Sequence, residues 1–161
     1  MKQPPKPERE TTTPPRRIPT ARKWLVFAAV APGIFVTLLD EIGVNQAVPR
    51  IATHFNATIP DVQWIVLAYL LTVGALLLPI GRVADMIGHR KIYLAGVSIF
   101  ALGGLLAGFS QSVLMLVLFK VMQGTGAAMI QATGLPIITS AFPTAQRGRA
   151  IGGFVGVLAM G

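Results

Sequence analysis

Two stretches of this sequence are apolar and free of charged side chains over the thickness of a bilayer. Residues 62–80 and 92–109 contain no Asp, Glu, Lys or Arg. A helix of about 20 apolar residues, rising about 1.5 Å per residue, crosses a hydrocarbon core of about 30 Å. A hydrophobic content of 53% in 161 residues also exceeds what a soluble domain usually carries. The sequence therefore predicts an all-α transmembrane protein.

Five membrane spans and one tail account for the chain. The predicted helices cover about residues 24–49, 62–81, 92–110, 113–140 and 150–161, and the last is truncated after about 18 Å, inside the membrane. Residues 1–23 contain six prolines and seven basic residues, which predicts a flexible cytoplasmic tail. A signal peptide would also fit the first apolar segment. That segment runs on to Val48 without a nearby small-x-small cleavage site, so we expect a retained helix.

Lysine and arginine are distributed unevenly between the two sides of this topology. With a cytoplasmic N-terminus, 12 of the 14 basic residues lie inside, whereas the outer side has only Arg50. The positive-inside rule thus predicts a multi-pass protein of the cell (inner) membrane with its N-terminus in the cytoplasm. The same rule explains the net charge of +8 by contact with the lipid bilayer, so nucleic acid is not an expected partner.

The sequence gives little support for metal binding or enzymatic catalysis. Cysteine is absent, and His54 and His89 lie in predicted loops on opposite sides with no metal-ligand spacing around them. No nucleophile–base arrangement or phosphate-binding loop occurs, because Gly124-x-Gly126 lies in the middle of a predicted helix. We therefore expect neither an enzyme nor a bound metal or cofactor.

Three charged residues interrupt the predicted helices: Asp40, Glu41 and Lys120. Each costs roughly 2.5–3.5 kcal/mol inside a bilayer, so each needs a partner or a role. Counted from the outer helix ends, Asp40 and Lys120 lie at about the same depth, about 12–13 Å. Because Asp40 and Glu41 are about 100° apart around a helix, we expect Asp40 rather than Glu41 to face the bundle interior.

An acid and a base at one depth favour two interpretations. Such a pair can hold a proton and release it when a cation binds or the distance to the lysine changes, which a proton-coupled carrier requires. The alternative is a purely structural salt bridge. Breaking a buried pair is costly in both cases, so loss of function alone would not separate them.

Small residues spaced four apart mark predicted helix contacts. They occur in Gly104-x-x-x-Gly108, Gly124-x-x-x-Ala128 and Gly152-x-x-x-Gly156. Such positions let helix backbones approach closely in a membrane, although glycine is also common in membrane helices generally. The predicted packing positions are Gly104, Gly108, Gly124, Gly126, Gly152 and Gly156.

Residues 81–91 connect the second and third predicted helices. Glycines allow a tight reversal, Asp85 can pair with an arginine, and Arg90 with Lys91 can bind anionic headgroups. The pattern resembles the signature loop of the major facilitator superfamily, with His89 where that family usually has Arg or Lys. The matching residues are Gly81, Val83, Asp85, Gly88, Arg90 and Lys91.

Two helices are similar to the 14-helix drug:proton antiporter branch of that superfamily. The first carries Leu39-Asp40-x-x-x-Val44-Asn45-x-Ala47-Val48-Pro49. The fourth carries Leu116-x-x-x-Lys120-x-x-Gln123-Gly124-x-Gly126-Ala127-Ala128, with lysine where the motif has arginine.

This resemblance covers residues 24–161 and implies the first four helices and part of the fifth of a larger bundle. It implies alternating access around a midplane site and export of small amphipathic drugs, driven by a proton gradient. Asp40 would be a proton or cation site, with Glu41 beside it. Lys120 would replace the proton-linked arginine, and the gating loop would include Asp85 and Arg90. The C-terminal half of the transporter would then be the missing partner.

Two alternatives remain open. A carrier of the same superfamily with another substrate is favoured if transport is insensitive to the pH gradient. A truncated membrane protein that does not transport is the other, because four and a half helices cannot form two bundles around a central site.

Overall fold

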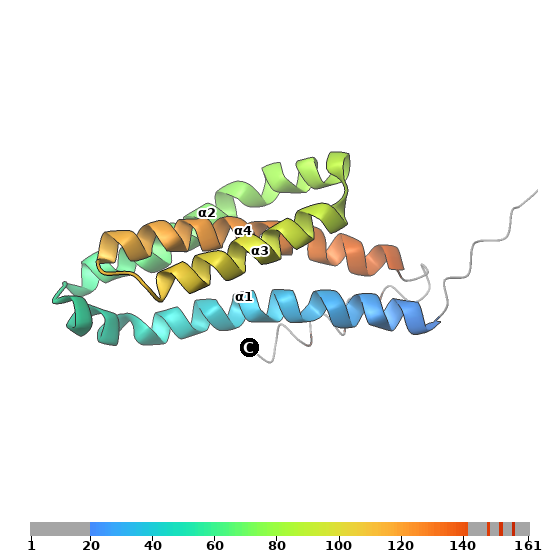
Figure 1. Cartoon of the computed structure of the whole chain (residues 1–161). Helices are drawn as coiled ribbons and strands as arrows, with labels where there is room; N and C mark the ends of the chain where they lie inside the picture. Colours follow the sequence, from blue (N-terminus) through green and yellow to red (C-terminus); the bar gives the residue numbers. More distant parts are fainter. Residues whose placement is uncertain (1–19, 142–147, 149–151, 153–155, 157–161) are drawn as a thin grey trace, which may run out of the picture.

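Four long α-helices make up the described part of the chain (Figure 1). The computed structural model describes residues 20–141 and residues 148, 152 and 156. Its helices are α1 (Thr20–Phe55), α2 (Ile59–Ile87), α3 (His89–Ala107) and α4 (Val113–Ala141). Each runs antiparallel to the one before it, and all four are long and apolar enough to cross a membrane. The prediction of an all-α transmembrane fold is confirmed.

The helices differ in length from the spans predicted from charges and prolines. Helix α1 continues through Pro49 to Phe55, and α2 runs from Ile59 to Ile87. A polar side chain ends an apolar span but not a helix, because the i to i−4 backbone hydrogen bonds do not depend on side-chain polarity. Of the predicted fifth span, only Gly152 and Gly156 are described, both as helical. The rest of that span and residues 1–19 of the tail lie outside the described residues.

The turn between α1 and α2 is fixed by local hydrogen bonds. Asn56 has a φ of 48°, and the N–H of Ala57 donates to the carbonyl of Ala52 at 3.0 Å, which closes the end of α1. Thr58 then caps α2. Its hydroxyl oxygen accepts from the N–H of Asp61 at 3.4 Å, and the Asp61 carboxylate accepts from the N–H of Thr58 at 3.3 Å. This reciprocal capping box makes the reversal short.

Helix α4 lies at the centre of the bundle and contacts the other three helices. One core cluster joins all four helices, and a smaller one lies near the α1–α2 turn. Large apolar side chains such as Leu78, Met86 and Phe109 are exposed, as expected of a surface that faces lipid rather than water. The main cluster consists of Val30, Ile34, Tyr69, Tyr93, Phe100, Ala127, Ile130, Ile137 and Ile138.

Glycines bring α3 and α4 into backbone contact. A methyl group added at Gly126 would lie 2.5 Å from the Phe100 nitrogen, and one at Gly103 would lie 2.9 Å from the Gln123 nitrogen. At Gly96 it would lie 2.7 Å from the β-carbon of Met129. No sequence motif had singled out Gly96 or Gly103, although their spacing of one heptad places them on the same helix face.

The other predicted packing glycines have different surroundings. Gly124 lies against α2, because an added methyl group would be 3.1 Å from the Tyr69 carbonyl oxygen. At Gly104 the nearest atom belongs to the Gln123 side chain at 3.4 Å, and at Gly108 to its own helix, at 3.3 Å. Gly152 and Gly156 have no described neighbour within 4 Å of that position. The motif Gly104-x-x-x-Gly108 is therefore not the place where α3 and α4 approach most closely.

Candidate functional site

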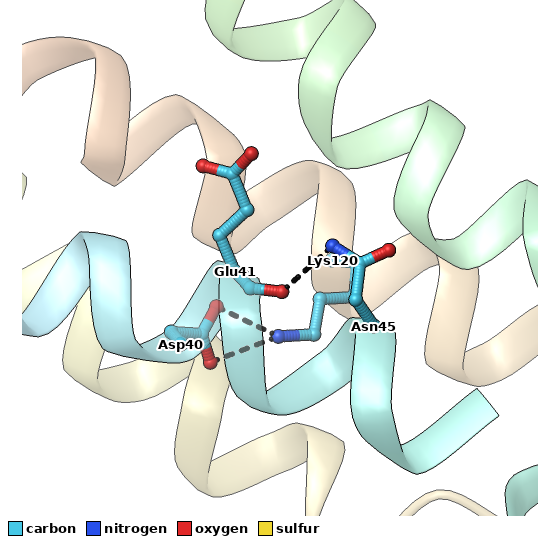
Figure 2. A network of polar contacts seen from close by, with 4 residues as sticks. All are labelled: Asp40, Glu41, Asn45 and Lys120. Carbon is cyan, nitrogen blue, oxygen red and sulfur yellow. Dashed lines mark hydrogen bonds and ion pairs between the residues drawn. The ribbon is translucent and has the colours of Figure 1, made fainter. Parts of the chain in front are cut away.

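An ion pair joins α1 to α4 inside the bundle. The Lys120 ammonium donates to both carboxylate oxygens of Asp40, at 3.0 and 2.9 Å (Figure 2). The Lys120 side chain is 6% exposed and that of Asp40 is 22% exposed. In such an apolar setting the two opposite charges stabilise each other. A single buried charge without its partner would destabilise the fold. The structure thus brings these two sequence-predicted residues together.

Glu41 does not share this contact. Figure 2 shows its side chain leaving α1 in a different direction from that of Asp40, so its carboxylate lies apart from the ion pair, as the 100° step around α1 requires. Its side chain is half-buried, and its backbone carbonyl accepts from the Asn45 side chain at 3.0 Å. Of the two acidic residues, only Asp40 is neutralised by Lys120, so the described site keeps one excess negative charge when both acids are ionised.

Tyr69 on α2 completes the surroundings of the pair, and sequence reasoning had not assigned it a role. Its ring centre lies 5.8 Å from the Lys120 nitrogen, within the range of a cation–π contact. The residue is only 3% exposed, and its hydroxyl has no hydrogen-bond partner among the described residues. Tyr69 lies in the uncharged run 62–80, and nothing in that run indicated that its side chain faces α1 and α4.

Two clefts adjoin this cluster. A narrow one of about 10 Å³ is lined by Asp40, Glu41, Val44, Val66, Tyr69 and Lys120. A wider, more open one of about 500 Å³ lies between α1 and α2 toward their shared turn, and Val66 lines both. The wide cleft presents two amides, Asn45 and Gln63, among apolar side chains. Both clefts therefore lie on the α1–α2 side of the ion pair.

The predicted gating loop lies far from this cluster. Asp85 is about 24 Å along α2 from Tyr69 at about 1.5 Å per residue, at the end of the bundle where α2 meets α3. Asp85 pairs with His89 at 3.2 Å, while Arg90 and Lys91 are exposed. Gly88 has a φ of +109°, which favours glycine at this reversal. Gly81 has no described neighbour within 4 Å of an added methyl group.

This arrangement can be compared with known families. The model of the Major Facilitator Superfamily matches residues 30–161. The chain belongs to the Major Facilitator Superfamily. The resemblance found in the loop and in two helices is thereby confirmed at the level of the family, and the chain is a multi-pass membrane protein of that superfamily.

Curated relatives in the superfamily are named for different cargoes. The chain is 37% identical to the riboflavin transporter RibZ of Clostridioides difficile over 131 residues, which are 81% of this chain and 29% of the relative. It is 37% identical over 137 residues to the tetracenomycin C resistance and export protein of Streptomyces glaucescens, covering 85% and 26%. It is 35% identical over 138 residues to the multidrug resistance protein Stp of Mycobacterium tuberculosis, also covering 85% and 26%. The chain thus spans 26–29% of the length of these superfamily members.

Proposed function

We propose that this chain is the first part of a proton-coupled exporter of small amphipathic compounds, in which Asp40 and Lys120 form the coupling pair. The observation that carries the proposal is the buried ion pair between α1 and α4. Two of the relatives are named for drug resistance or export, which favours this direction of transport. The chain spans 26% of each of these two relatives, so their length leaves room for the second bundle that alternating access requires.

Protonation of Asp40 changes the contact between α1 and α4. A proton that binds Asp40 removes the negative charge that holds Lys120, and the lysine is left as an unpaired buried cation. The contact between α1 and α4 is then less favourable, so the two helices can separate toward another conformation. Release of the proton on the other side restores the pair. Proton binding and helix movement are thereby coupled.

The described basic residues support a cytoplasmic N-terminus in the cell membrane. Arg82, Arg90 and Lys91 all lie at the end of the bundle where α1 begins and α2 meets α3. Arg50 is the only described arginine or lysine near the opposite end. By the positive-inside rule, the α1–α2 turn and the wide cleft then face the outside.

A carrier for another substrate is the second candidate, and the riboflavin transporter among the relatives favours it. The two candidates share a fold and differ in the energy source and cargo. Substrate movement that persists after the pH gradient is collapsed would favour this second candidate.

The test distinguishes a role of the ion pair in proton coupling from a role in the stability of the protein alone. In membrane vesicles that contain the full-length protein, Asp40→Asn is expected to abolish proton-driven dye efflux. The double variant Asp40→Asn/Lys120→Gln replaces the ion pair by two neutral side chains of similar shape, so it is expected to regain thermal stability without regaining efflux. The matched control is Asp61→Asn, which changes an exposed acid at the start of α2 and should leave efflux intact. Efflux restored in the double variant would mean that the pair is only structural.

A further inference from the structure

One buried hydroxyl has no hydrogen-bond partner in the part of the chain that the structure describes. The Tyr69 side-chain oxygen makes no hydrogen bond within the described residues, although the residue is 3% exposed. The other fully buried tyrosine differs in this respect, since the Tyr93 hydroxyl donates to the Val30 carbonyl at 3.1 Å. Burying a hydroxyl without a hydrogen bond is unfavourable, so nearly all such groups in proteins bind protein or water. The Tyr69 hydroxyl therefore calls for a partner that the described residues do not supply.

The narrow cleft offers room for such a partner. Its enclosed part is large enough for about one water molecule. A buried water needs two to four polar neighbours, and four polar or charged groups line this cleft. Asp40 and Glu41 approach from α1, Tyr69 from α2 and Lys120 from α4. Because Asp40 and Lys120 already bind each other, the Glu41 carboxylate and the Tyr69 hydroxyl are the two groups left to hold the water.

We propose that the narrow cleft binds one water molecule, held by the Tyr69 hydroxyl and the Glu41 carboxylate, and that this water connects Glu41 to the ion pair. Glu41 is thereby the proton-receiving group, and it lies one helical turn from Asn45, which lines the wide cleft. Tyr69 is a positioning residue, because it orients the water and does not itself change protonation state.

The transfer step is a simple exchange of protons. The carboxylic acid of Glu41 gives its proton to the water, and the water gives one of its own protons to the Asp40 carboxylate. One O–H bond breaks at Glu41 and one forms at Asp40, while the negative charge moves from Asp40 to Glu41. Lys120 loses its ionic partner in the same step. This transfer rests on the proposed proton coupling, whereas the water site does not.

The water is detected directly by infrared spectroscopy of the purified full-length protein in lipid nanodiscs, in ordinary water and in water labelled with the heavy oxygen isotope. The difference spectrum between the parent and Tyr69→Phe is expected to contain a water O–H stretching band that shifts with the isotope. Tyr69→Phe removes only the hydroxyl and keeps the ring beside Lys120. Glu41→Gln is the second variant, and it should lose or displace the same band.

The matched control is Thr72→Val. Thr72 lies one turn further along α2, and its hydroxyl donates to the Ala68 carbonyl of its own helix at 2.6 Å, so its removal leaves the cleft unchanged. The isotope-sensitive band should therefore persist in this variant. A difference spectrum of Tyr69→Phe without any isotope-sensitive band overturns the water site. A band lost in Tyr69→Phe, together with unchanged efflux in Asp40→Asn, supports the water site and overturns the transfer step.

Discussion

The two sides of α4 are built differently. On one side α3 lies so close that glycine backbones meet, with Gly126 against Phe100 and Gly103 against Gln123. On the other side α1 meets α4 through side chains, with Ile34 packed on Gly134 and Asp40 bound to Lys120, and open clefts remain between α1 and α2. Close backbone contacts gain dispersion energy without any charge, whereas the ion pair can change with protonation. The α3–α4 interface is thus suited to remain fixed and the α1–α4 interface to move.

The largest effect on stability is expected at the ion pair. Lys120→Met leaves the Asp40 carboxylate without its partner, and loss of one member of a buried pair typically costs 3–5 kcal/mol. Because Asp40 keeps 22% of its side chain exposed, we expect a value near the lower end, about 3 kcal/mol. Denaturant unfolding in mild detergent measures it. Lys91→Met, at an exposed lysine, is the control and should change stability by less than about 0.5 kcal/mol. A loss below about 1 kcal/mol for Lys120→Met would show that water already reaches Asp40.

A somewhat smaller effect is expected at the glycine contact. Gly126→Ala places a methyl group 2.5 Å from the Phe100 nitrogen, so α3 and α4 must separate slightly, and overpacking of this kind costs about 1–3 kcal/mol. Gly74→Ala is the matched control, because nothing lies within 4 Å of the added methyl group and the gain in helix propensity is the same. The same unfolding assay compares them. Equal stability of the two variants would contradict the view that α3 and α4 form the fixed interface.

The sequence predicted the four described helices because long uncharged runs leave few other structures in a membrane. It also placed Asp40 and Lys120 at one depth, since helical rise converts residue number into distance. The structure adds their contact at 2.9 Å. Rotation of each helix about its own axis was harder to predict, because lipid-facing and core-facing side chains are both apolar here. For that reason Tyr69 was not assigned to the site.

The glycine spacings left the closest helix contacts open for the same physical reason. A four-residue spacing marks a helix face but does not say whether another helix lies against it. Gly104 and Gly108 share a face, yet the closest approach to α4 uses Gly96 and Gly103. The turn glycine Gly88 was easier to predict, because a positive φ is a local property of the backbone.

The smallest effect on stability is expected at the α1–α2 turn. This turn joins the two helices on the more open side of the bundle, and local hydrogen bonds hold it. Thr58→Ala removes the hydroxyl that accepts from the Asp61 N–H, and loss of such a cap typically costs about 1 kcal/mol. Thr53→Ala is the control, because the Thr53 hydroxyl donates only to the Arg50 carbonyl of its own helix. If the capping box alone holds the turn, Thr58→Ala should make amide hydrogen exchange faster in the first turn of α2. Exchange at the α3–α4 interface should remain unchanged in the same variant. Faster exchange at both interfaces would mean that they are coupled, and the division of the bundle into a fixed and a movable side would then fail.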